Sequence, residues 1–257
     1  MKVVLTSAYR VGSTWTAEIL SAILECRWDS LNSVIWGPPY RSRYLRPGDP
    51  PSLELEPSIC KSLMAVRDFH SGVCKTHNFL PSTLLPILGP ELKLVTITRH
   101  SYDALVSLFM YCRHHRVAQG EANDPWFEEF IATNIHLSDG EFMNHLVHTL
   151  PNEVCELLMI QKRFREIPES EFIMSLRYED LMEHPKDTIY KLARFMERTP
   201  SVGQINSILE TTSKEALSAK FNKDYEGQTK FIREARSNQW QDTFDDVSVG
   251  ILNSLNL

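Results

Sequence analysis

Residues 3–15 of this 257-residue chain read VVLTSAYRVGSTW. The first four are β-branched or apolar and predict a buried strand, whereas Trp15 and Ile19 begin a helical spacing of apolar residues. The loop between them is short and consists of small, polar and basic residues. A strand, a loop and a helix in this order predict an α/β fold, with the loop at the carboxyl end of the strand.

The remaining chain repeats this alternation of short β-rich runs and longer helical patterns. Such an alternation favours right-handed crossovers and a parallel sheet with helices on both faces. We therefore predict an α/β sandwich with a central parallel sheet. The predicted strands cover residues 3–6, 72–76, 92–98 and 171–176, and the predicted helices follow residue 15, start at 103 and cover 152–167 and 189–196.

Residues 31–60 differ in composition, because they hold six of the 14 prolines. Such a segment neither continues a helix nor pairs as a central strand. Long irregular loops in compact domains are often functional. We expect an insertion that covers a functional site within one domain spanning residues 1–257.

Charge and composition exclude several classes of protein. Lys and Arg total 27 against 33 Asp and Glu, a net charge of −6 that argues against a nucleic-acid or anionic-membrane partner. The longest apolar runs are too short for a membrane span, and the first residues do not resemble a signal peptide. Five scattered cysteines predict reduced thiols, and we expect a cytoplasmic protein.

The loop before residue 15 has the chemistry of an anion site. A helix N-terminus offers backbone N–H groups and a positive dipole end. Gly12 permits close approach, Ser13 and Thr14 add hydroxyl donors, and Arg10 can contact a phosphate in a bidentate way. The Walker A pattern and its lysine are absent. Taken alone, the loop fits an ordinary strand–helix turn equally well.

Two further strand ends add charged residues. Lys75 and His77 lie two residues apart, on the same side of a strand, which suits a phosphate-side cation beside a general base. Arg99 ends another strand, and Ser107 follows Asp103 by one helical turn. We expect Arg99 and Ser107 to form a second phosphate clamp, with Asp103 capping the helix or orienting Arg99.

These segments together resemble sulfotransferases that use 3′-phosphoadenosine 5′-phosphosulfate (PAPS). The loop at 7–15 resembles the family's T-Y-P-K-S-G-T-T-W segment, and residues 75–77 its K-T-H segment. Residues 99–107 resemble R-x-P-x-D-x-x-x-S, 178–185 resemble Y-E-D-L-x-x-x-P, and 233–240 have the spacing of R-K-G-x-x-G-x-W. The matches occur in chain order over most of the length. The resemblance implies a P-loop-like fold.

The resemblance also implies roles for individual residues. His77 would be the general base, with Lys75 and Arg10 stabilising charge on the leaving group. A small-molecule acceptor would supply the attacking hydroxyl or amine, and no metal would be required. The implied nucleotide-binding residues are Arg10, Val11, Gly12, Ser13, Thr14, Trp15, Arg99, Ser107, Tyr178, Ser213, Arg233, Glu234 and Ala235.

The chain departs from the family pattern in several places. Arg10 replaces a lysine, Val11 replaces a serine, and the R-K-G motif is reduced to Arg233 followed by Glu234 and Ala235. We expect Glu234 to point away from a 3′-phosphate because it would repel one. The family's dimer motif is absent after residue 240, so we expect a monomer or a dimer formed by another route.

Two other functions remain open at this point. A P-loop kinase or NTPase shares the strand–loop–helix opening, although the Walker A lysine and a Walker B acid are absent. A catalytically silent, nucleotide-binding relative is the second alternative, favoured by the reduced motif at 233–235. The presence of Lys75 and His77 favours the enzyme over both.

Overall fold

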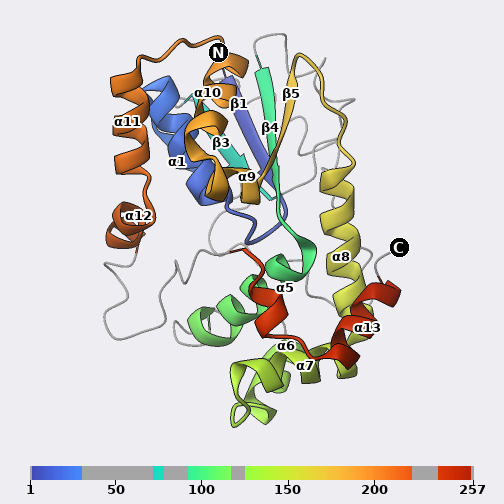
Figure 1. Ribbon diagram of the computed structural model, residues 1–257. Coiled ribbons are helices and arrows are strands. Elements are labelled where there is room, and N and C mark those ends of the chain that lie inside the picture. The colour runs from blue at the N-terminus through green and yellow to red at the C-terminus, as the bar shows by residue number, and fades with distance from the viewer. Residues whose placement is uncertain (1, 31–71, 78–91, 117–124, 222–236, 256–257) are drawn as a thin grey trace. The chain divides into compact units, whose positions relative to one another are not determined.

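The computed structural model describes residues 2–30, 72–77, 92–116, 125–221 and 237–255 (Figure 1). The chain divides into two compact units. Of the described residues, the first unit contains 2–30, 72–77, 92–99 and 163–217, and the second contains 100–116, 125–162, 218–221 and 237–255. The Pro-rich segment 31–60 lies outside the described residues.

A five-stranded sheet forms the centre of the first unit, with strand order β2-β3-β1-β4-β5 (Figure 1). All its neighbouring strands pair in parallel. Their carboxyl ends therefore lie at one edge of the sheet, where ligands bind in folds of this class. The strands are β1 (Lys2–Ser7), β2 (Trp28–Ser30), β3 (Val73–Thr76), β4 (Leu92–Thr98) and β5 (Ile173–Arg177).

The core of this unit follows from the apolar runs in β1 and β4. Val3, Val4 and Leu5 are all buried, although alternate residues of a strand point to opposite faces. A central parallel strand is covered on both faces, so it tolerates a continuous apolar run. Thr6 pairs with Thr76 of β3 and Thr96 of β4, and this register brings the segments that follow the three strands to the same edge.

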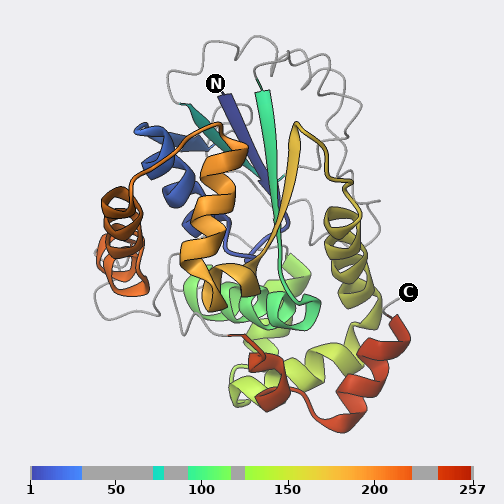
Figure 2. The same ribbon diagram turned by 45° about the horizontal axis from the view of Figure 1, so that its top comes forward.

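Five helices described in or extending from this unit are α1 (Ser13–Leu24), α9 (Tyr178–Glu183), α10 (Pro185–Phe195), α11 (Val202–Thr211) and α12 (Lys214–Phe221). Helix α1 packs on β1 and β3 and contacts α10 and α11 (Figures 1 and 2). Pro185 occupies the first turn of α10, where its fixed φ and missing N–H are tolerated.

The second unit is helical. Helix α5 (Ser101–Tyr111) continues into a π-helical turn, η4 (Cys112–Arg116). Helices α5 and α13 both contact α7, and η5 packs on α5. Its other elements are α6 (Pro125–Thr133), α7 (Asp139–Thr149), α8 (Pro151–Arg165), η5 (Gln239–Asp242) and α13 (Asp246–Leu255).

The predicted α/β class and parallel sheet are confirmed, with two local differences. The sequence patterns did not indicate β2, which contains only three residues. The helix predicted to start at 103 begins two residues earlier, at Ser101, and His100 is its N-cap residue (φ −50°, ψ 125°). Among the described helices, none is long and apolar enough to cross a membrane.

Candidate active site

The loop between β1 and α1 presents an open helix N-terminus. Gly12 is the N-cap of α1, and no side chain caps the helix at this position. The first turn also contains no acidic residue. The N–H groups of Ser13, Thr14 and Trp15 therefore begin a 12-residue helix whose positive end has no negative side chain of its own.

Gly12 is required by its backbone and by its neighbour. Its φ is 93°, in the left-handed region that favours glycine. A Cβ at this position would lie 2.6 Å from Cδ2 of Tyr178, the first residue of α9. The glycine expected to approach a ligand thus also allows the loop to pack on a buried tyrosine ring.

Tyr178 connects this loop to Arg99. The Arg99 guanidinium carbon lies 4.3 Å from the centre of the Tyr178 ring, a cation–π contact. An Arg99 Nη1–H also donates to the Arg10 carbonyl oxygen at 3.3 Å. Arg99 is 6% exposed and Tyr178 4% exposed. These two predicted nucleotide-binding residues support the loop by packing and hydrogen bonding.

Lys75 reaches the same loop from β3. Its Nζ donates to Thr14 Oγ1 at 3.1 Å. Burial, followed by the positive charge of Arg10, lowers the pKa of Lys75 to about 8, while Glu18 acts in the opposite direction. The structure thus brings together two residues separated by 61 positions in the sequence at the start of α1.

His77 lies beside the loop, where the backbone of Ser7 and Ala8 faces its ring. Its Nδ1 is 3.2 Å from the Ser7 carbonyl oxygen. A carbonyl oxygen only accepts, so this contact favours the neutral tautomer with the hydrogen on Nδ1 and the lone pair on Nε2. The ring stacks on Tyr9, with centroids 4.2 Å apart. Burial, followed by the charge of Lys75, lowers the pKa of His77 to about 3, so the ring is neutral at pH 7.

Trp15 contributes a polar group that the protein itself leaves unpaired. Its indole Nε1 is buried, and no hydrogen-bond acceptor for it is found among the described residues. The Trp15 ring packs edge-on against Tyr178 at 6.0 Å. A buried donor without a partner is costly and is a recognised feature of ligand sites. The indole and the open end of α1 therefore fit a hydrogen-bonding, anionic ligand.

In the second unit, Ser107 lies on α5 and is partly exposed. Asp103, one turn earlier, is completely buried. Its carboxylate accepts the backbone N–H of Asn238 at 2.8 Å and of Trp240 at 3.1 Å. The Trp240 ring stacks on His100, with centroids 5.4 Å apart. Asp103 was expected to cap the helix or orient Arg99, whereas these hydrogen bonds hold Asn238 and Trp240 at the start of η5.

Of the remaining predicted residues, Val11 and Ser213 have roles within the fold, and three others lie outside the described residues. Val11 is completely buried, so its side chain belongs to the core under the loop. Ser213 accepts the Ala216 N–H at 3.2 Å through its hydroxyl, which makes it a cap of α12. The three predicted residues Arg233, Glu234 and Ala235 lie outside the described residues.

Two residues next to Lys75 were not expected from the sequence. The Lys75 Nζ lies 4.8 Å from the centre of the Trp28 ring, and Trp28 Nε1 donates to Glu18 Oε1 at 2.8 Å. Glu18 follows Thr14 by one helical turn, which was a usable signal. Trp28 gave no signal, because its strand is too short to show a pattern.

The comparisons with known proteins identify the family. A sulfotransferase domain model matches residues 1–255. This chain belongs to the sulfotransferase family. It is 26% identical to sulfotransferase 1A1 of Canis lupus familiaris, over 93% of this chain and 77% of that protein. It is also 26% identical to sulfotransferase 1 family member D1 of Rattus norvegicus, over 94% of this chain and 77% of that protein.

Solved structures agree with this assignment at the level of the fold. Retinol dehydratase, crystallised with retinol and PAP, is similar with a TM-score of 0.60 and 21% identity, over 99% of this chain and 79% of that chain. Mouse sulfotransferase SULT7A1, crystallised with PAP, is similar with a TM-score of 0.59 and 14% identity, over 99% and 82% of the two chains. The predicted family and the P-loop-like fold are therefore confirmed, and the chain is a sulfotransferase enzyme.

The predicted absence of a metal stays a prediction. Among the described residues, no three His, Cys, Asp or Glu side chains gather where they could hold a metal ion. Arg10, Lys75 and the α1 amides provide positive charge at the site without one.

Proposed function

We propose that this sulfotransferase uses PAPS as donor and transfers its sulfuryl group to a hydroxyl or amine of a small-molecule acceptor. PAPS supplies an activated sulfuryl group: the acceptor atom bonds to sulfur as the bond between sulfur and the 5′-phosphate oxygen breaks. The observation that supports this best is the hydrogen bond from Lys75 to Thr14 at the uncapped N-terminus of α1.

Different residues of the chain remove the proton and stabilise the developing charge. The neutral His77 accepts the acceptor's proton at Nε2, because its Nδ1 hydrogen is directed at the Ser7 carbonyl. Arg10, Lys75 and the first N–H groups of α1 stabilise the negative charge that develops on the 5′-phosphate side. These groups are held by the fold beforehand, so little reorganisation accompanies the reaction.

The lowered pKa of His77 belongs to the protein without nucleotide. Lys75 and Arg10 both lower this pKa through their positive charge. Burial is the largest cause of the lowered value and stays in place, but a bound anionic donor offsets the charge of Lys75 and Arg10 and so raises the pKa of His77. His77 is thereby a stronger base when the donor is present than when the site is empty.

The nucleotide's other contacts rest on the family resemblance. We propose that Arg99, Ser107 and Arg233 bind the 3′-phosphate and that Trp15 contacts the nucleotide. The unpaired, buried indole N–H of Trp15 supports the second assignment. Ser213 and Tyr178 are proposed to shape the surroundings of the nucleotide, Tyr178 through its contact with Arg99.

A transfer assay with PAPS tests the proposal. The acceptor panel contains phenols, a retinoid alcohol, a steroid alcohol and an aryl amine, because retinol and androsterone are bound by structural neighbours. The proposal predicts sulfated product and stoichiometric PAP, without added metal. PAP binding without transfer to any acceptor would support the silent relative, and transfer of phosphate from MgATP would support the kinase alternative.

A further inference from the structure

Lys75 is enclosed by groups from three elements of the first unit. It lies on β3, it donates to Thr14 on α1, and its ammonium lies over the Trp28 ring of β2. Strands β2 and β3 are paired with Trp28 opposite Val73, two residues before Lys75. This register places the indole beside the outgoing lysine side chain.

The indole is itself held in place. Trp28 Nε1 donates to Glu18 Oε1 at 2.8 Å, a charge-assisted hydrogen bond. A carboxylate that accepts from the indole N–H fixes the ring's rotation and polarises its electrons towards the face. Both effects favour a cation above the ring. Thr14 and Glu18 lie one turn apart on α1, so this helix holds the lysine directly through Thr14 and indirectly through Glu18 and the Trp28 ring.

From these contacts we propose that Glu18 and Trp28 are positioning residues, which hold the Lys75 ammonium against Thr14 and keep it charged. This inference rests on the proposed function, because a fixed Lys75 cation contributes to activity only if an anionic nucleotide binds at this loop. Neither residue is proposed to contact the reacting atoms.

The charges around Lys75 explain why such support is needed. Arg10 in the loop and burial both favour loss of the Lys75 proton, and Glu18 is the nearby group that opposes them. His77, which follows β3, is neutral and offers no counter-charge. Asp29 follows Trp28 in β2, is exposed and lies on the opposite face of the strand by alternation. The counter-charge therefore comes from α1.

Competitive acetylation of the protein without nucleotide tests this directly. Trace acetic anhydride is used at pH 7.5, and peptide mass spectrometry compares Lys75 with exposed Lys186 as an internal reference. Only the uncharged amine reacts, so the rate reports both the charge and the covering of Lys75. We expect Glu18→Gln and Trp28→Leu each to raise relative labelling of Lys75 at least about twofold, because a fall of about half a pH unit from a pKa of about 8 doubles the uncharged fraction at pH 7.5.

Glu171→Gln is the matched control. Glu171 is an exposed carboxylate just before β5, and in a parallel sheet this is the edge opposite to the end of β3. Its loss should leave Lys75 labelling unchanged. If Lys75 is labelled in Glu18→Gln and Trp28→Leu at the wild-type rate, while circular dichroism shows both folded, the inference is wrong.

A PAP titration separates this inference from the proposed function. In the wild type, affinity for PAP should fall as pH rises through about 8, and in Glu18→Gln the decline should begin at lower pH. If wild-type protein does not bind PAP, the proposed function fails, whereas the labelling result still judges the role of Glu18 and Trp28. If PAP binds with the same pH profile in both proteins, the inference alone fails.

Discussion

Two histidines show how differently the two units use polar side chains. His77 is half-buried in the first unit beside a backbone carbonyl, a tyrosine ring and a lysine. His114 is partly exposed in the second unit, and its Nε2 lies 2.7 Å from Asp139 Oδ1. The first is a neutral ring in a positively charged environment, and the second has a carboxylate partner. Proximity to a charged group therefore does not by itself indicate catalysis.

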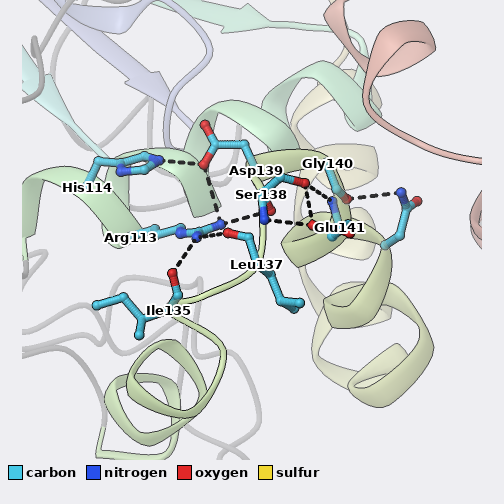
Figure 3. Close-up of polar contacts among 9 residues, drawn as sticks. Arg113, His114, Ile135, Leu137, Ser138, Asp139, Gly140 and Glu141 are labelled. Atoms are coloured by element: carbon cyan, nitrogen blue, oxygen red, sulfur yellow. Dashed lines mark hydrogen bonds and ion pairs between the residues drawn. The ribbon is translucent and has the colours of Figure 1, made fainter.

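The surroundings of His114 complete the contrast (Figure 3). Arg113 donates to the carbonyls of Ile135, Leu137 and Ser138 and pairs with Asp139 at 3.4 Å. Ser138 and Glu141 form a capping box at the start of α7. These groups form hydrogen bonds and ion pairs with one another, which is typical of a structural cluster that holds η4 against the start of α7. In the first unit, by contrast, the Trp15 indole N–H has no acceptor among the described residues and no side chain caps the N-terminus of α1, so both can bind a ligand.

The largest expected effect follows from removing each histidine in turn. His77→Ala should lower kcat with PAPS by at least about 10²-fold, because a general base typically contributes that much, while the Kd for PAP stays within about threefold. His114→Ala should leave kcat within about threefold. Steady-state assays and PAP titrations measure both. Near-normal turnover in His77→Ala would assign the base to another residue.

Two glycines sharpen the comparison further. Gly12→Ala adds a Cβ 2.6 Å from Tyr178 at a φ of 93°, so we expect loss of PAP affinity by at least tenfold and a lower Tm. Gly250→Ala, in α13, has nothing within 4 Å of its new Cβ. It should stabilise the protein by about 0.5–1 kcal/mol through helix propensity. Calorimetry and thermal melting test the pair, and equal effects would contradict this description of the loop.

Arg113→Ala tests the second cluster as a structural element. The side chain is 8% exposed, and its loss removes the donor to the carbonyls of Ile135 and Leu137 and leaves His114 as the partner of Asp139. We expect the free energy of unfolding to fall by about 2–3 kcal/mol, with the Kd for PAP unchanged. Urea unfolding gives the first quantity. A tenfold weaker Kd at unchanged stability would instead give Arg113 a role in binding.

Asp103 should also act as a structural residue of the second unit. Asp103→Ala removes the acceptor for the N–H groups of Asn238 and Trp240, at a cost of about 1–3 kcal/mol. Urea unfolding measures this cost. A variant as stable as wild type would show that these amides find other acceptors.

The smallest effect is the titration of His77 itself. With a pKa of about 3, the ring is neutral above about pH 4, so its NMR signals should not shift between pH 5 and 8 in the protein without nucleotide. Addition of PAP should raise the pKa, because the anion offsets the charge of Lys75. A midpoint near 6.5 without nucleotide would show that the ring is not desolvated as described.

Sequence patterns predicted the elements that are determined by neighbouring residues along the chain. β1 and β4 contain runs of apolar and β-branched residues, and α1 has apolar residues at helical spacing. Lys75, His77 and Arg99 were singled out because they lie at the ends of strands of a parallel sheet. Register then brings Lys75 to Thr14, as a shared sheet edge requires.

The contacts that sequence could not predict are distant and specific. Asp103 binds amides 135 and 137 positions away, and no local pattern identifies backbone donors. Asn238 adopts a left-handed φ of 59° where the resembling motif has glycine, which asparagine tolerates. The pairing of Trp28 with Glu18 depends on β2, three residues long, whose existence is decided by its pairing with β3.

Calorimetric titration with PAP, with ADP as the control and no added metal, tests the central claim most directly. We predict micromolar binding of PAP and at least about tenfold weaker binding of ADP, which lacks the 3′-phosphate. Equal or tighter binding of ADP, or binding that requires magnesium, would contradict it and favour a nucleoside-triphosphate enzyme on the same fold.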